Sequence, residues 1–374
     1  MFICGGLMKV VVAMDSFKGS LTSLEAGNAV RRGILRSCPD ADVTVLPLAD
    51  GGEGTIDALA PFINGITETL AVTGPDGKKI NADYIFDPKT DTAYIEMAKA
   101  AGLTLIGQNG RNPYITTTYG VGELMRDAVS NGAGKLVICI GGSATNDGGA
   151  GMLQALGAKL LDKDGKDIGY GAAGLKELYS IDTSDMTGRD TGMTVACDVT
   201  NPLCGPDGAS FVYGPQKGAS EDMCKEMDAW LEHFAVTAGF DPYEAGTGAA
   251  GGMSFALKNF FNAELRSGAG IVLDITGAEP EIRDCNIVIT GEGRMDSQTV
   301  NGKAPLKILQ TAKKYGKLVY GITGILGEGY EECLKAGFER IIPLTVPSMV
   351  TEEAVKSAEE TAAILFEELY GRSV

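Results

Sequence analysis

The sequence predicts an α/β fold of two domains, in which both chain ends build a Rossmann- or flavodoxin-like parallel sheet. Near each end of the 374-residue chain, strand and helix patterns alternate, which is typical of a parallel sheet covered by helices. The middle instead shows consecutive strand patterns joined by turns. Segments 8–72 and 286–374 are therefore expected to form one discontinuous domain, with 73–285 inserted as a mixed-sheet α/β domain. Residues 1–7 are expected to be an N-terminal extension.

The first segment opens with a buried strand. Val10–Met14 is uninterrupted apolar sequence, as expected for a strand covered on both faces. Ser20–Arg36 has the apolar spacing of an amphipathic helix, and Ser20 or Thr22 offers a hydroxyl to cap its start. The next patterns are a strand at Val43–Leu48 and a helix at Thr55–Phe62.

The pattern changes to antiparallel strands after Thr73. The turn sequences 74–77 and 87–91 bound the strand patterns Lys79–Phe86 and Thr92–Met97, which predicts a β meander. The elements expected next are a helix at Thr117–Asn131, a strand at 136–140, a hairpin at Leu160–Asp167, a strand at Thr194–Asp198 and a helix at Ser220–Thr237.

Alternation of strand and helix returns near Ile287. The expected strands are Ile287–Thr290, Leu318–Ile322 and Arg340–Thr345, and the expected helices are Ala304–Tyr315, Tyr330–Ala336 and Thr351–Leu369. The cleft between the two predicted domains is the expected place for a ligand site.

Charge and cysteine content exclude several classes of protein. A formal net charge of −17 disfavours nucleic acid and anionic membranes as partners. No apolar run reaches the ~18 residues of a membrane span, and Met1–Leu7 is too short and lacks the basic region of a signal peptide. The eight cysteines form no CxxC pair, which indicates a reducing cytoplasm rather than a disulfide scaffold or zinc site.

A glycine-rich segment between a strand pattern and a helix pattern is the strongest candidate for a phosphate site. It contains Gly141, Gly142, Ser143, Ala144, Thr145, Asn146, Asp147 and Gly148. Glycines allow close approach of the backbone, and the amides at a helix start attract an anion. Because a carboxylate beside a phosphate requires a metal ion or a proton, Asp147 predicts chemistry with Mg²⁺.

Carboxylates follow several predicted strands, at the edge where open α/β sheets bind ligands. They are Asp15, Asp50, Asp198 and, after Glu292, Asp296. Such carboxylates bind Mg²⁺, bind hydroxyl groups or accept a proton. Each one taken singly is explained as well by helix capping or turn formation, but four in equivalent positions favour a functional site.

Basic residues near these strand ends are suited to an anionic substrate. Lys18 stands at a predicted helix entrance, and the Arg294 guanidinium is suited to a bidentate grip on a carboxylate. A structural ion pair between Arg294 and Asp296 is the alternative. Lys217 and Lys303, both next to glycines, are weaker candidates.

Two other signals do not indicate the functions that they first suggest. The GxGxxG string at 246–251 follows no clear strand, and no acidic residue stands ~20 positions on at the end of a second strand. It therefore favours a close-packing or phosphate loop over a dinucleotide fingerprint. The single histidine, His233, lies on a predicted helix near Trp230 and Phe234, which favours packing. A Ser-His-Asp hydrolase and a His-ligated zinc enzyme are therefore disfavoured.

Six motifs in order resemble the type I glycerate kinases. They are residues 15–20, 47–55, 141–149, 198–203, 246–252 and 290–303. The resemblance runs from about Met8 to the C-terminus. It implies ATP-dependent phosphorylation of D-glycerate, at the 2-hydroxyl to give 2-phosphoglycerate, with Mg²⁺, and two α/β domains of which one is inserted in the other.

Roles for the candidate residues follow from this resemblance as hypotheses. Asp198 is assigned as the general base, residues 141–148 to the ATP phosphates, and Asp147 and Asp198 to Mg²⁺. The residues assigned to the substrate are Asp15, Lys18, Arg294 and Asp296. The alternatives are a kinase of another small hydroxy acid or polyol, an NAD-dependent oxidoreductase and a non-catalytic binding regulator. A homodimer is left open.

Overall fold

The computed structural model describes residues 8–17 and 19–370, so the predicted extension at 1–7 and Lys18 lie outside the described residues. The chain divides into two units: Gly51–Gly268 is unit 2, and the residues before and after it are unit 1. The division falls at 50/51 and 268/269, not at the predicted 72/73 and 285/286. The physical reason is that strand β3 (Ile66–Thr73) pairs with a strand of unit 2, whereas helix α11 (Ala278–Asp284) packs under the sheet of unit 1.

Unit 1 contains the predicted parallel sheet. Its strands are β1 (Lys9–Met14), β2 (Asp42–Pro47), β11 (Ile287–Gly291), β13 (Leu318–Thr323) and β15 (Arg340–Pro343). Their spatial order is β15-β13-β11-β1-β2, and every neighbouring pair is parallel. Counted along unit 1, this is the flavodoxin-like order 2-1-3-4-5, which reverses direction between β1 and β11. The fold class is therefore confirmed.

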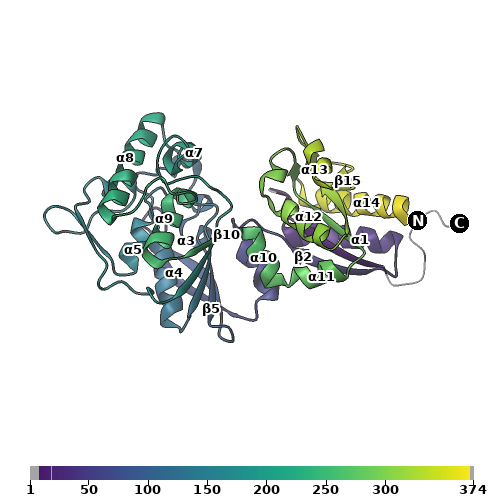
Figure 1. Ribbon diagram of the computed structural model, residues 1–374, viewed down its shortest axis with the longest axis horizontal. Helices are drawn as coiled ribbons and strands as arrows, with labels where there is room; N and C mark the ends of the chain where they lie inside the picture. Colours follow the sequence, from purple (N-terminus) through teal and green to yellow (C-terminus); the bar gives the residue numbers. More distant parts are fainter. Residues whose placement is uncertain (1–7, 18, 371–374) are drawn as a thin grey trace. The chain divides into compact units, whose positions relative to one another are not determined.

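Helices cover both faces of this sheet (Figure 1). Alternate residues of β1 point to opposite faces, so Val10 and Val12 join one core while Val11 and Ala13 join the other. The first core is closed by α1 (Ser23–Ser37) and α14 (Thr351–Tyr370). The helices on the second face are α10 (Gly268–Thr276), α11, α12 (Ala304–Lys314) and α13 (Glu331–Ala336).

Helix α1 joins the two ends of the chain. It begins after Thr22, whose hydroxyl and Glu25 form a reciprocal capping box, so of the two predicted caps Thr22 is the one used. A side chain at Gly33 would stand 2.0 Å from the carbonyl oxygen of Glu359, which explains the glycine and the close packing of α1 on α14.

Unit 2 holds a six-stranded mixed sheet with the order β10-β9-β6-β5-β4-β3. Its strands are β3, β4 (Lys79–Asp87), β5 (Thr92–Glu96), β6 (Lys135–Cys139), β9 (Gly192–Ala196) and β10 (Glu264–Arg266). Strands β3, β4 and β5 form an antiparallel meander, and β5, β6, β9 and β10 run parallel. The meander predicted from β4 and β5 gains β3 as its unpredicted edge strand.

Most helices of unit 2 pack on one large apolar cluster. They are α3 (Ala98–Ala101), α4 (Tyr119–Ser130), α5 (Ala150–Ala155), α6 (Ala172–Leu175), α7 (Ala209–Tyr213), α8 (Glu221–Ala238) and α9 (Ala249–Phe261), whereas α2 (Thr55–Leu59) lies beside β5. At the predicted hairpin, β7 (Lys159–Leu161) makes a single bridge to Asp167 and then pairs with β8 (Ser180–Asp182). Among the described residues, no helix has the length and hydropathy that a membrane span requires.

Candidate active site

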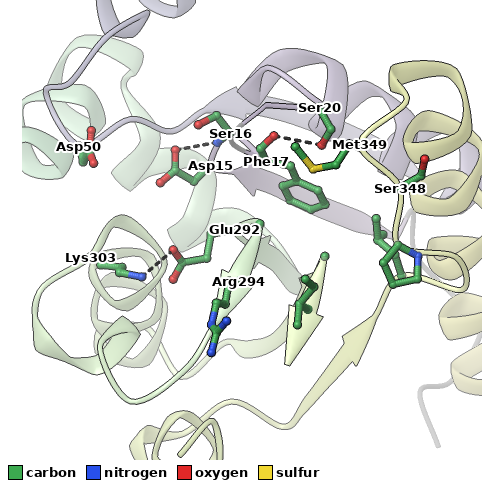
Figure 2. A pocket seen from close by; sticks show the side chains of 15 residues that line it. Asp15, Ser16, Phe17, Ser20, Asp50, Glu292, Arg294, Lys303, Ser348 and Met349 are labelled. Carbon is green, nitrogen blue, oxygen red and sulfur yellow. Dashed lines mark hydrogen bonds and ion pairs between the residues drawn. The ribbon is translucent and has the colours of Figure 1, made fainter. Parts of the chain in front are cut away.

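A cavity of about 500 Å³ lies in unit 1, at the carboxyl ends of its parallel strands. Asp15 follows β1 and Glu292 follows β11, so the two carboxylates flank the point where the strand order reverses. This is the position where open α/β sheets bind their ligands. Figure 2 shows charged side chains toward one end of the cavity and apolar side chains toward the other.

The charged end includes two predicted strand-end aspartates. Asp15 is held in place because its amide donates to the Gly291 carbonyl (2.8 Å) and its Oδ1 accepts from the Ser16 amide (2.7 Å). Asp50, close after β2, lines the same cavity. The carboxyl ends of neighbouring parallel strands thus bring together two carboxylates that lie far apart along the sequence.

Glu292 and Lys303 form an ion pair in this end of the cavity. Glu292 Oε2 lies 3.0 Å from Lys303 Nζ, and Oε1 accepts from the Thr299 hydroxyl at 2.7 Å. The turn after β11 depends on Gly291, because a Cβ there would stand 1.7 Å from the Ile322 carbonyl oxygen. Lys303 also precedes the first residue of α12, so its charge and the positive end of that helix act together on an anion.

Arg294 lines the cavity and pairs with Asp296. Arg294 Nε lies 3.2 Å from Asp296 Oδ2, and the arginine side chain is 61% exposed. The structural ion pair considered as an alternative is therefore present. Because guanidinium carries five N–H donors, this pair orients Arg294 and still permits a substrate carboxylate to bind.

The apolar end was not predicted from the sequence. Its walls are Phe17, Ile325, Leu344, Pro347 and Met349. These residues come from three separate segments, and only Phe17 stands in one of the motifs singled out in the sequence. Glu292 was also left out of the predicted site residues, although its position directly after a buried strand is a signal that could have identified it.

The glycine-rich segment 141–149 lies in unit 2 and is mostly buried. Ser143 to Gly149 are all buried, and only Gly141 and Gly142 reach the surface. Several amides already donate within the protein: Ala144 to Ala101, Gly148 to Gly251 and Gly149 to the Asp147 carboxylate. Helix α5 after the segment has only six residues. These amides are occupied within the protein, and the phosphate contacts of residues 141–148 stay a prediction.

Asp147 has a structural environment in unit 2. Its Oδ2 accepts from the amide and hydroxyl of Thr118 (2.9 and 2.8 Å) and from the Gly151 amide, and its Oδ1 accepts from the Gly149 amide. The residue is completely buried, and burial raises the pKa of its carboxyl above the ordinary value. This conformation therefore disfavours the predicted Mg²⁺ contact and gives Asp147 a role in shaping the segment.

Lys217 lies beneath the same segment. It is 1% exposed, and its Nζ donates to Ser143 Oγ (2.9 Å) and to the Thr145 carbonyl (2.7 Å). Removal from water lowers the pKa of Lys217 to about 7, while the nearby Asp147 carboxylate acts in the opposite direction. Lys217, a weaker candidate from the sequence, thus holds the segment 141–149 in place from within unit 2.

This buried lysine predicts a pH dependence of the stability of unit 2. Between about pH 7 and 10 the unfolded chain keeps the Lys217 proton and the folded chain releases it, so the free energy of unfolding rises with pH, by up to about 1.4 kcal/mol per pH unit. Lys217→Met should lack this rise. Urea unfolding followed by the fluorescence of Trp230, the single tryptophan, checks it because Trp230 lies in unit 2. Equal pH slopes in the two proteins would contradict it.

Asp198 lies at the carboxyl end of β9 in unit 2 and is exposed. Both of its carboxylate oxygens lie near the Gly268 amide, at 3.2 and 3.3 Å, which fixes the side chain at the surface. Of the two predicted Mg²⁺ ligands it is the one with an accessible carboxylate. The described residues contain no group of three or more His, Cys, Asp or Glu side chains arranged to hold a metal ion.

The glycines at 246–252 serve close packing. A Cβ at Gly248 would stand 2.0 Å from the Pro202 carbonyl oxygen, and one at Gly251 would stand 2.0 Å from that of Thr145. Helix α9 starts within the string, and the described residues directly before the string form no strand. The close-packing interpretation therefore fits, and the nucleotide-binding βα turn that an NAD-dependent oxidoreductase would need is not formed here.

The fold and the site define an α/β protein with a charged cavity at the switch point of a flavodoxin-like sheet. Residues 10–371 match the glycerate kinase family. The chain is 46% identical to the glycerate 2-kinase of Escherichia coli and 45% identical to the glycerate kinase of Bacillus subtilis, each over 94% of both chains. A crystal structure of putative glycerate kinase 2 from Salmonella typhimurium has a TM-score of 0.86 at 43% identity, covering 98% of this chain and 99% of that one. This chain belongs to the glycerate kinase family.

Proposed function

We propose that this protein transfers the γ-phosphoryl group of ATP to the 2-hydroxyl of D-glycerate, giving 2-phosphoglycerate and ADP. The observation that carries the proposal in the structure is the charged end of the unit 1 cavity, where Asp15, Asp50 and Glu292 face the same space as Lys303. Membership of the glycerate kinase family supports the same reaction. Neither another substrate class nor nicotinamide chemistry has a supporting observation.

Glycerate needs a cation for its carboxylate and acceptors for its two hydroxyls. Arg294 is proposed to bind the carboxylate, since its planar fork matches that group. Asp15 is proposed to accept a hydrogen bond from a hydroxyl, and Asp296 to act through the orientation of Arg294. Lys303, held by Glu292, supplies positive charge where the phosphoryl group is transferred.

ATP is the phosphoryl donor, and Mg²⁺ is proposed as its metal ion. When bound, Mg²⁺ neutralises charge on the phosphates and is usually held by one or two carboxylates together with phosphate oxygens. Asp198 fits this description in residue type and exposure. Gly141 and Gly142 remain predicted phosphate contacts.

Asp198 is also proposed as the general base that accepts the proton of the attacking hydroxyl. Phosphoryl transfer depends mainly on in-line positioning and charge neutralisation, and a positioned base adds about 10²–10⁴-fold. The exposure of its carboxylate supports the role, since a base must reach the reacting hydroxyl. The proposal includes a cytoplasmic location and leaves a homodimer open. The seven described cysteines, all free, support a reducing compartment.

The reaction is tested by incubating the purified protein with ATP, Mg²⁺ and D-glycerate. ADP release measures turnover, and ³¹P and ¹H NMR of the product identify the phosphorylated hydroxyl. We expect a phosphorus resonance coupled to the proton on C2. Coupling to the C3 protons would reassign the position, and ADP release that is independent of glycerate would reject the proposed acceptor.

Arg294→Ala is expected to raise KM for D-glycerate about 10–100-fold and to change KM for ATP much less. The physical reason is the loss of a charge-assisted interaction worth about 1.5–3 kcal/mol. Steady-state kinetics with each substrate varied in turn provides the measurement. Arg340→Ala, which removes an exposed arginine of the same unit that does not line the cavity, is the control. A larger rise in KM for ATP would reassign Arg294 to the nucleotide.

A further inference from the structure

We propose that the apolar end of the unit 1 cavity binds the adenine ring of ATP. This inference rests on the proposed function, because it takes ATP as the phosphoryl donor. It assigns the nucleotide base to the C-terminal part of the chain and to the turn after β1. Figure 2 shows Phe17 and Met349 on the side of the cavity that faces away from Lys303 and Asp50.

The size of the cavity indicates a ligand larger than glycerate. Cavities of about 300–1,000 Å³ are typical of drug-sized ligands, and this one measures about 500 Å³. Glycerate is a three-carbon acid with an oxygen on every carbon, so it fills only a small part of this space. The remaining volume requires a second ligand or a second part of the same ligand.

The chemistry of the walls identifies that second part. Phe17, Ile325, Leu344, Pro347 and Met349 offer no charge, and each gains stability from contact with an apolar surface. Every part of glycerate is polar, and so are the ribose and phosphates of ATP. Adenine is the one flat, weakly polar surface that either substrate carries.

The exposure of these apolar side chains favours their being a binding surface. Met349 is 70% exposed and Ile325 is 51% exposed, so both present apolar surface to solvent. Clustered exposed apolar side chains mark binding sites more often than scattered ones do. Their exposed surface is what a bound ring would cover.

Residues 345–351, which include Met349, are held in position by hydrogen bonds within the protein. The amides of Thr345 and Val346 donate to hydroxyls of α14, those of Thr361 and Ser357, at 3.1 and 2.8 Å. On the other side, the Thr351 hydroxyl donates to the Ser20 carbonyl at 2.9 Å. Met349 packs over Gly19, where an added Cβ would stand 2.6 Å from its terminal methyl group. The walls are therefore preformed, which lowers the entropy cost of binding.

This placement also suits the reaction. Both ends belong to one cavity, so an adenine ring bound at the apolar end directs the phosphates of ATP toward Lys303 and the carboxylates. The γ-phosphoryl group and the glycerate hydroxyl must meet for in-line transfer. A shared charged end brings them together.

The test compares two pairs of truncations. Met349→Ala and Ile325→Ala remove walls of the apolar end, and each is expected to raise KM for ATP about tenfold with little change in KM for glycerate. Val346→Ala and Val350→Ala are matched controls, because these side chains are similarly exposed (58% and 57%), lie close to Met349 and do not line the cavity. The controls should match the unaltered protein.

Two readouts separate this proposal from the proposed function. Adenosine binding, measured by saturation-transfer NMR without glycerate, should be lost in the Met349 and Ile325 variants and retained in the controls. Preference for ATP over inorganic tripolyphosphate as a donor should fall in the same variants. If glycerate is not phosphorylated but these adenosine results hold, the proposed function fails and the base site stands. If glycerate is phosphorylated but KM for ATP and adenosine binding do not change, or KM for glycerate rises instead, the base site is wrong.

Discussion

Asp198→Asn is expected to lower kcat for D-glycerate phosphorylation by about 10²–10⁴-fold, the range that a positioned general base contributes. The fold should persist, because the asparagine carbonyl still accepts from the Gly268 amide at the position that Asp198 holds now. Initial rates of ADP formation at saturating substrates measure the effect. Asp207→Asn, the same change at an exposed aspartate of the same unit, should retain normal turnover.

The Mg²⁺ dependence of the variant separates the two roles proposed for Asp198. Loss of a base leaves the Mg²⁺ concentration for half-maximal rate unchanged and removes the acidic limb of the pH–rate profile. Loss of a metal ligand instead raises the Mg²⁺ requirement, and excess Mg²⁺ or Mn²⁺ restores part of the rate. Near-normal kcat in the variant would reject both roles and make Asp15, a buried carboxylate of the unit 1 cavity, the next candidate.

Lys303→Met should lower kcat for glycerate phosphorylation by about 10²–10³-fold. Removing one preorganised donor to developing transition-state charge typically has this effect. Lys303 is preorganised because its ammonium already lies 3.0 Å from Glu292, whose other oxygen accepts from Thr299. Initial-rate kinetics with ATP and glycerate each held at saturation provides the measurement.

Three further variants make this result specific. Lys307→Met removes an exposed lysine from the same helix, four residues on and outside the cavity, and should have normal kinetics. Lys303→Arg keeps the charge and should recover part of the rate. Glu292→Gln, which keeps an acceptor for Thr299, should have a smaller effect than loss of the lysine. If Lys307→Met lowers kcat as much as Lys303→Met does, the loss of rate comes from a change in α12 and not from the cavity.

Local sequence patterns were sufficient to predict most of unit 1. Val10–Met14 is apolar at every position because β1 is covered on both faces. Such a run predicts a buried strand. The end of the closing helix was predicted within one residue, at Leu369 against the observed Tyr370. Strand β3 was missed because its outward side chains are polar and its pairing with β4 is a tertiary property. Helix α9 was missed because its first turn is rich in glycine.

The candidate site was only partly predictable, for a different reason. Asp15 and Arg294 were found because charged residues directly after buried strands stand out in a sequence. The apolar walls have no such signal, since Leu344 and Phe17 resemble any core residue until the folded chain brings them together. The role of segment 141–149 stays a prediction, because in a sequence glycines that allow close packing resemble glycines that receive a phosphate. In the fold, a Cβ at Gly149 would stand 2.5 Å from the Ala256 side chain, so this glycine serves close packing.

The pairing of β1 with β11, the central strand of unit 1, affects the order in which the chain can fold during synthesis. Lys9 and Asn286, whose hydrogen bond lies at the start of the β1–β11 pair, are 277 residues apart. At about 5–20 residues per second, a ribosome needs roughly 15–55 s to deliver the second partner. Throughout that interval β1 lacks its partner strand β11, and the inserted unit, which ends at Gly268, is complete in sequence before β11 is made. We expect nascent chains to protect the inserted unit from protease first, and the N-terminal strands to depend on a chaperone until the last helix emerges.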